Sequence, residues 1–239
     1  NVYLIAISRN TRRELIKVGA LPNKVFSILN SVDKDVFKPM NRDYAKTLVE
    51  EFFKIKLRDK VLLHVNPGPR KGTHILIKAV AILKRIYGDK FILLIAGRLG
   101  PKTYREYIVN MVRGLKLEEN VKMLGYVENK LLPALYNVAD ITIVPSYSEG
   151  GSLVTPESLA CGAPVIATNV GGNLEYLRLT HLDSLLIEVD KYDFSLSLAR
   201  KILSVLREDK IKYNFDTIPS IHDMARSLYK SLNSIVRNL

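Results

Sequence analysis

Short apolar runs alternate with segments of helical periodicity along almost the whole of this 239-residue chain. Residues 73–87 illustrate the helical spacing, with one face formed by Ile75, Ala79, Ile82 and Ile86. The apolar runs lack polar alternation, which is typical of strands buried on both faces. We therefore predict an α/β fold, a Rossmann-like parallel sheet flanked by helices. The predicted strands are Val2–Ile7, Lys24–Leu29, Val61–Val65, Phe91–Ala96, Val121–Leu124, Ile141–Val144, Val165–Thr168 and Leu185–Val189.

Turns that contain glycine follow three of these strands, after Val65, Ala96 and Val144. The carboxyl ends of parallel strands meet at one edge of a sheet, and ligands bind at that edge. We therefore expect the three turns to converge on one site. Further helices are predicted over 102–113, 130–138 and 218–239, with two short helices within 191–216.

The turn over residues 145–157 carries two carboxylates eight positions apart, Glu149 in the loop and Glu157 early in the following helix. Between them, Gly150 and Gly151 let the backbone approach a ligand, with unpaired helix N–H groups behind them. Such N–H groups favour phosphate, and each carboxylate can accept hydrogen bonds from hydroxyl groups. This combination suits a nucleotide sugar.

Two cations, Arg70 and Lys71, follow the predicted strand 61–65 and precede a helix. Cations at a helix N-terminus favour a diphosphate, because lysine supplies a point charge and arginine a forked donor. When a sugar leaves a nucleotide diphosphate, negative charge grows on the departing group. Fixed cations would stabilise that transition state more than the ground state.

These residues resemble the signature of glycosyltransferase family 4, the retaining group 1 glycosyl transferases, with its Glu-x7-Glu motif. The resemblance covers roughly the whole chain. It is carried, in the family's order, by residues 4–8 with 11–15, 28–33 with 37–39, 70–72, 94–97, 121–125, 163–168 and 171–175. The family implies the C-terminal domain of a GT-B fold. It also implies transfer of a sugar from a nucleotide-diphosphate sugar to an unknown acceptor, with retention of anomeric configuration and no cofactor.

The resemblance also implies roles for individual residues. Lys71, Arg70 and Glu149 are expected to be catalytic, with Glu149 facing the hydroxyls of the donor sugar. Glu157 is expected to hold the ribose, and Tyr126 stands where relatives place the nucleobase. The complete set expected to bind the donor is Gly68, Gly72, Gly97, Tyr126, Gly150, Gly151, Ser152, Leu153, Val154 and Glu157.

Three parts of the chain are expected from the resemblance. Residues 1–38 would end an acceptor-side domain and cross between domains, residues 39–217 would form the donor-binding domain, and 218–239 a C-terminal crossing helix. The N-terminal acceptor domain would then lie outside this sequence, and the chain alone would bind donor but turn over poorly.

Two departures from the family pattern leave alternatives open. The family places an arginine near Asn66 and Pro67, where this chain has none, so Arg70 is a candidate substitute. Gly151-Ser152 replaces a common aromatic-Gly pair, which bears on sugar specificity. The alternatives are a non-catalytic nucleotide-sugar-binding subunit and a sugar-nucleotide epimerase on the same architecture.

Charge and composition bound the partners. Lys plus Arg number 36 against 24 Asp plus Glu, a formal net charge of +12, which suits phosphate ligands or peripheral association with an anionic membrane. No nucleic-acid module is recognisable. The single cysteine, Cys161, fits a reducing, cytoplasmic compartment, including the inner membrane face. Asp33-Lys-Asp35 has the form of a metal motif but is interpreted as a turn, and we expect no metal.

Overall fold

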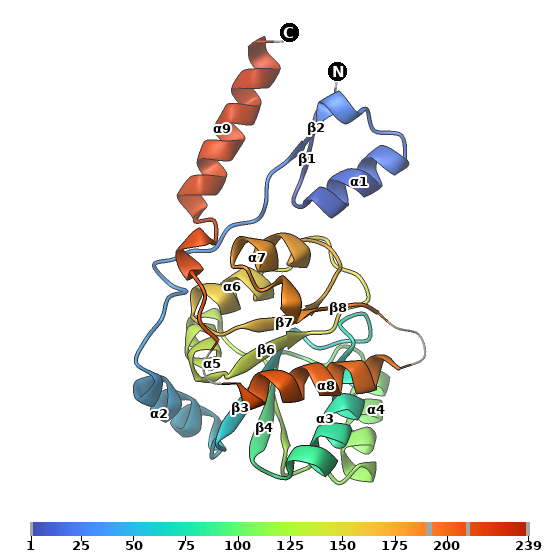
Figure 1. Cartoon of the computed structure of the whole chain (residues 1–239), viewed down its shortest axis with the longest axis vertical. Coiled ribbons are helices and arrows are strands. Elements are labelled where there is room, and N and C mark those ends of the chain that lie inside the picture. Colours follow the sequence, from blue (N-terminus) through green and yellow to red (C-terminus); the bar gives the residue numbers. More distant parts are fainter. Residues whose placement is uncertain (1, 190–192, 209–210, 238–239) are drawn as a thin grey trace.

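The computed structural model describes residues 2–189, 193–208 and 211–237 (Figure 1). Its main sheet contains six parallel strands in the order β5-β4-β3-β6-β7-β8. The predicted class, a Rossmann-like parallel sheet flanked by helices, is confirmed. The strands are β3 (Lys60–Val65), β4 (Phe91–Ala96), β5 (Val121–Gly125), β6 (Ile141–Val144), β7 (Val165–Thr168) and β8 (Leu186–Ile187).

The strand order reverses beside β3. The chain first steps outward through β4 to β5, then returns to place β6 on the opposite side of β3. Right-handed crossovers therefore put α3 and α4 on one face of the sheet and α5, α6 and α7 on the other. In addition, α8 packs against α3, and α2 packs against α5 (Figure 1). The helices are α2 (Arg42–Phe53), α3 (Thr73–Tyr87), α4 (Lys102–Gly114), α5 (Leu132–Val138), α6 (Val154–Ala160), α7 (Asn173–Leu179) and α8 (Phe194–Arg207).

The central strands are buried on both faces, as their uninterrupted apolar sequences require. No residue of Phe91–Ala96 exposes more than 1% of its surface. Cys161 also belongs to this core, at the end of α6, and burial raises the pKa of its thiol to about 12. None of the helices in the described ranges combines the length and the apolar character needed to cross a membrane.

The first residues form a separate small unit, which we call the N-terminal segment (residues 2–30). In it β1 (Leu4–Ala6) pairs in parallel with β2 (Val25–Ser27), and α1 (Arg9–Lys17) connects them. This unit and the last helix, α9 (Ile221–Arg237), both lie above the main sheet in Figure 1. Val32 and Ser220 form a parallel bridge, so the outgoing and returning chains run side by side.

Some predicted elements differ from the observed ones. The two short helices predicted within 191–216 are wrong: the described part of this stretch holds one long helix, α8, and a short 3-10 turn (Phe215–Thr217). Its apolar side chains continue along one face without a break and pack on α3. Residues 191–192 and 209–210 lie outside the described residues. Helix α2 was not predicted, because it buries only Ala45 and Val49. The edge strand β8 is shorter than the predicted 185–189, and β1 and β2 are shorter than the predicted 2–7 and 24–29, whereas β5 extends one residue beyond the predicted 121–124.

Candidate functional site

A cleft of about 1400 Å³ lies at the carboxyl ends of β3, β4 and β6, where the strand order reverses. Most residues predicted from the sequence line it: Arg70, Lys71, Gly97, Tyr126, Glu149, Gly150, Gly151, Ser152, Leu153, Val154 and Glu157. Gly68 and Gly72 do not line it. Gly72 is needed for a different reason: its φ is +68°, and a Cβ there would lie 2.1 Å from the carbonyl oxygen of Pro145.

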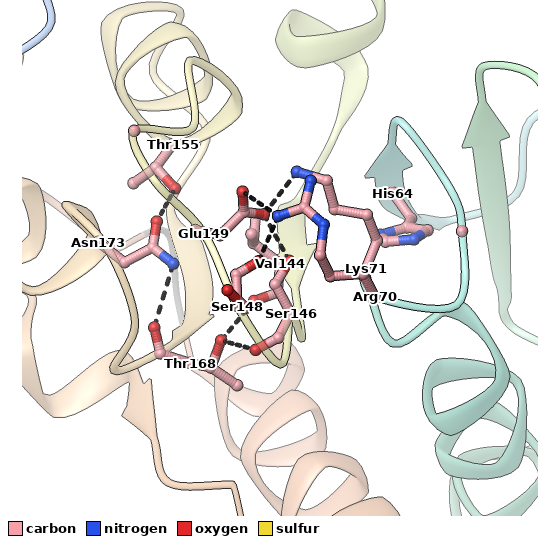
Figure 2. A network of polar contacts seen from close by, with 12 residues as sticks. His64, Arg70, Lys71, Val144, Ser146, Ser148, Glu149, Thr155, Thr168 and Asn173 are labelled. Atoms are coloured by element: carbon pink, nitrogen blue, oxygen red, sulfur yellow. Dashed lines mark hydrogen bonds and ion pairs between the residues drawn. The ribbon is translucent and has the colours of Figure 1, made fainter. Parts of the chain in front are cut away.

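An ion pair joins the two loops that border the cleft. Lys71 Nζ donates to Glu149 Oε1 at 2.6 Å, and Arg70 Nη1 lies 3.7 Å from Glu149 Oε2 (Figure 2). Arg70 Nη1 also donates to the carbonyl oxygen of Ser148 at 2.6 Å. The Glu149 side chain is only 4% exposed, so these cations balance a carboxylate that is almost removed from water. Residues 78 positions apart are thereby held in one site.

A buried polar network supports the loop that carries Glu149 (Figure 2). Ser146 Oγ donates to Glu149 Oε1 at 2.6 Å, and Thr168 Oγ1 donates to the Ser146 carbonyl oxygen at 2.6 Å. Asn173 Nδ2 donates to the Thr168 carbonyl oxygen, and Asn173 Oδ1 accepts from Thr155 Oγ1 at 2.7 Å. The network ties the loop to β7, α6 and α7, so the carboxylate has one fixed position.

A second chain of hydrogen bonds fixes the loop that carries Lys71. His64 is buried in β3, with Nδ1 2.9 Å from the Ile143 carbonyl oxygen and Nε2 2.9 Å from Thr73 Oγ1. A carbonyl only accepts, so Nδ1 carries the proton and Nε2 accepts from the Thr73 hydroxyl. Thr73 Oγ1 in turn accepts the Gly68 N–H at 2.9 Å.

This chain requires a neutral imidazole. Burial lowers the pKa of His64 to about 4. The nearby charge of Lys71 lowers this pKa further, whereas the hydrogen bond to the Ile143 carbonyl raises it. No role is predicted for His64 or Thr73 from the sequence. A polar ring inside an otherwise apolar strand was the available signal, but the partner 79 residues away was not visible.

Breaking this chain is expected to destabilise the protein. His64→Leu and Thr73→Val each leave a buried polar group without its partner, and we expect each to lower the free energy of unfolding by about 1–3 kcal/mol. Thr73→Ser keeps the hydroxyl and should cost less. Urea unfolding of the three variants measures this. A Thr73→Val variant as stable as Thr73→Ser would contradict the hydrogen-bond chain.

Glu157 occupies a partly buried position on α6, at the lining of the cleft. Burial raises its pKa to about 7, although a hydrogen bond donated by Tyr136 to Glu157 Oε2 at 2.9 Å acts in the opposite direction. The carboxylate therefore changes protonation near neutral pH. A ligand hydroxyl that donates to it would favour the ionised form.

The glycine that departs from the family pattern has a steric explanation. A Cβ on Gly151 would lie 2.6 Å from Ile7 Cδ1 and 2.7 Å from Asn30 Nδ2. The space that a larger residue would need is occupied by the N-terminal segment. Gly171, from the other side, would place a Cβ 2.7 Å from the Glu149 carbonyl oxygen. The loop is thus enclosed on both sides.

The two adjacent glycines of the turn before α7, Gly171 and Gly172, are required for different reasons. Gly171 has a φ of +58°, but Gly172 does not adopt a positive φ. A Cβ on Gly172 would instead meet Tyr176 at 3.3 Å, so close packing with α7 favours glycine there.

At the end of the cleft next to β5, on the side away from the Glu149 loop, an aromatic ring is paired with a cation. The guanidinium of Arg98 lies 5.4 Å from the centre of the exposed Tyr126 ring. Asn66 also lines the cleft, with a left-handed φ of +58° that asparagine tolerates. No arginine therefore stands at the end of β3, and Arg70 contacts the Glu149 loop from the following turn.

The Asp-x-Asp sequence forms a turn, as interpreted: Asp33 Oδ1 accepts the N–H of Asp35 at 3.0 Å. Among the described residues, no group of three or more histidine, cysteine, aspartate or glutamate side chains is arranged to hold a metal ion.

Solved structures share this architecture. A glycosyltransferase from Rickettsia africae superposes with a TM-score of 0.80 at 22% identity, over 100% of this chain and 64% of that one. The Anabaena protein HepE, solved in complex with UDP, superposes with a TM-score of 0.79 at 20% identity, over 97% of this chain and 64% of that one. These neighbours confirm the GT-B type of fold.

Relatives found by sequence have a higher identity to this chain than these two solved structures. A D-inositol 3-phosphate glycosyltransferase from Mycolicibacterium smegmatis is 35% identical over 68% of this chain, and one from Corynebacterium glutamicum is 33% identical over 72%. The chain spans 37% and 42% of the lengths of these two relatives. The family model described as glycosyl transferases group 1 matches residues 47–217. The chain belongs to the group 1 glycosyl transferases.

Proposed function

We propose that this chain binds a nucleotide-diphosphate sugar in the cleft. The sugar is then transferred to an acceptor with retention of configuration at the anomeric carbon. The observation that carries the proposal is the contact of Lys71 and Arg70 with Glu149, in a cleft that Glu157 also lines. The cleft therefore combines cations, which can bind phosphate, with carboxylates, which can accept hydrogen bonds from sugar hydroxyls. A nucleotide-sugar donor carries both kinds of group.

In the proposed reaction, the bond between the anomeric carbon and the diphosphate oxygen breaks. The acceptor hydroxyl oxygen forms the new bond on the same face, and its proton passes to the departing phosphate oxygen. Lys71 and Arg70 stabilise the negative charge that grows on the diphosphate. This assignment requires the donor to compete with Glu149 for both cations, so binding rearranges the ion pair.

The carboxylates would then have distinct roles. Glu149, held by Ser146, orients the hydroxyls of the donor sugar. Glu157 accepts from the ribose hydroxyls. Tyr126 and Arg98, at the other end of the cleft, face the nucleobase. Two observations support placing the sugar near Glu149 and the nucleobase near Tyr126: the order of these groups along the cleft, and the resemblance to the family pattern.

Calorimetric titration with UDP-, GDP- and ADP-sugars tests donor binding. We expect one base to be preferred, and UDP is the first choice because structural neighbours were solved with UDP and UDP-glucose. Absence of binding by every sugar nucleotide, in a folded sample, would defeat the proposal. Because the chain spans less than half the length of the two sequence relatives described above, transfer and the anomer of the product are measured on the whole protein.

One observation favours a second candidate, a non-catalytic subunit that binds nucleotide sugars. Asn66 lines the cleft at the position where the family's arginine is expected, so the diphosphate has one cation fewer at the strand end. This candidate predicts donor binding with no transfer by the whole protein.

A further inference from the structure

The N-terminal segment holds the loop that borders the proposed donor site. We call residues 149–152 the donor loop. Asn30 Nδ2 donates to the Gly151 carbonyl oxygen at 3.0 Å. The hydroxyls of Ser8 and Thr11 both lie 3.4 Å from the Gly150 carbonyl oxygen. Two consecutive carbonyl groups of the donor loop therefore point away from the cleft, toward the N-terminal segment.

The orientation of these carbonyls determines the orientation of the next N–H groups. In a planar trans peptide, the carbonyl and the following N–H point in opposite directions. The N–H of Gly151 and the N–H of Ser152 are therefore turned toward the cleft, which both residues line. Neither N–H donates a hydrogen bond to any residue in the described part of the chain. They are left available for the phosphate or sugar oxygens of a ligand.

Asn30 is itself fixed, so it can set the position of the loop. Its carbonyl oxygen accepts from the Tyr176 hydroxyl at 2.8 Å, which attaches residue 30 to α7. Its amide nitrogen fits closely over Gly151, because a Cβ there would lie 2.7 Å from it. Ile7 fills the adjoining space, 2.6 Å from the same Cβ position. Little freedom remains for the peptide plane between Gly151 and Ser152.

We propose that Asn30 is a positioning residue for the donor, an inference that rests on the proposed function. By holding the Gly151 carbonyl, it keeps the Ser152 N–H directed at the sugar-phosphate end of the donor. Donor affinity then depends on a residue outside the six-stranded sheet and its helices. Attachment of the N-terminal segment to the donor loop would thereby strengthen donor binding.

The test compares UDP-glucose with UMP, which lacks the second phosphate and the sugar, by calorimetry. For Asn30→Ala, we expect UDP-glucose to bind roughly 5- to 10-fold more weakly, since one partly buried carbonyl of the donor loop loses its hydrogen-bond donor. UMP is expected to bind with unchanged affinity, because the nucleoside end does not reach the donor loop. If the panel selects another base, the corresponding glucose nucleotide and monophosphate are used.

Gly151→Ala is the second variant, because it displaces Asn30 while leaving the asparagine and its bond to Tyr176 in the chain. Its effect and that of Asn30→Ala should not add in the double variant. Asn10→Ala is the matched control: Asn10 lies on α1, and its side chain makes no hydrogen bond with the described residues.

The outcomes separate the two proposals. If the wild-type chain binds neither nucleotide, the proposed function fails. If the wild type binds UDP-glucose and Asn30→Ala binds it equally well, the role of Asn30 is overturned. An equal loss of UMP and UDP-glucose would also overturn it, because it would indicate a general structural effect.

Discussion

Replacing Lys71 by methionine is expected to lower kcat/KM for glycosyl transfer by at least about 100-fold, measured on the whole protein. The Nζ charge would stabilise the departing diphosphate, and no neutral side chain can supply it. The substitution also leaves the carboxylate of Glu149, 4% exposed, with Arg70 at 3.7 Å as its remaining cation. We therefore expect a loss of stability as well.

A double variant separates the two effects. In Lys71→Met combined with Glu149→Gln, the buried charge is removed together with its partner, and the amide introduced at position 149 can still accept from Ser146. We expect urea unfolding to show most of the stability restored, while transfer stays as low as in Lys71→Met. Recovery of transfer along with stability would show that Lys71 acts only by neutralising Glu149.

Glu157→Gln is expected to make the protein more stable at pH 8 and to weaken donor binding. The folded protein keeps the Glu157 proton up to about pH 7, whereas the unfolded chain releases it near 4.5. Between these values the folded state binds more protons, so the free energy of unfolding falls as the pH rises. A shift of this size corresponds to about 3 kcal/mol. Glutamine avoids this cost and can still accept from Tyr136.

The gain should therefore depend on pH. The stability difference between Glu157→Gln and the wild type is expected to grow from pH 4.5 to 7 and then level off. In the same variant, donor affinity at pH 8 should fall by roughly 10-fold or more, because a hydrogen bond to a charged acceptor is lost. Glu14→Gln, on the exposed surface of α1, is the control. A gain of equal size at every pH would contradict the burial of an ionisable carboxyl.

The sequence predicted the fold well where local pattern and packing agree. The strands over 91–96 and 141–144 have the predicted bounds, since uninterrupted apolar residues there are buried on both faces. The apolar pattern did not predict α2, because this helix buries only two residues. It also divided the stretch around α8 into two short helices, although one amphipathic face continues through the whole of α8.

The candidate site was foreseen as residues but not as contacts. Glycines and carboxylates at strand ends pointed to the cleft, yet the sequence could not show that Lys71 would meet Glu149 rather than solvent. There was also no sign that Asn30 reaches Gly151, 121 residues away, or that His64 ties β3 to β6. Contacts of this kind arise from tertiary packing, which leaves little trace in local spacing.

The burial of the chain's one thiol has a practical consequence for spectroscopy. Cys161 is 3% exposed and its raised pKa keeps the thiolate fraction very low, so it should resist maleimide reagents under mild conditions. A single cysteine introduced on α1 and another on α4 would accept a fluorophore pair without first removing the native residue. Energy transfer between the two dyes would then report how the separation of these helices changes when a sugar nucleotide is added.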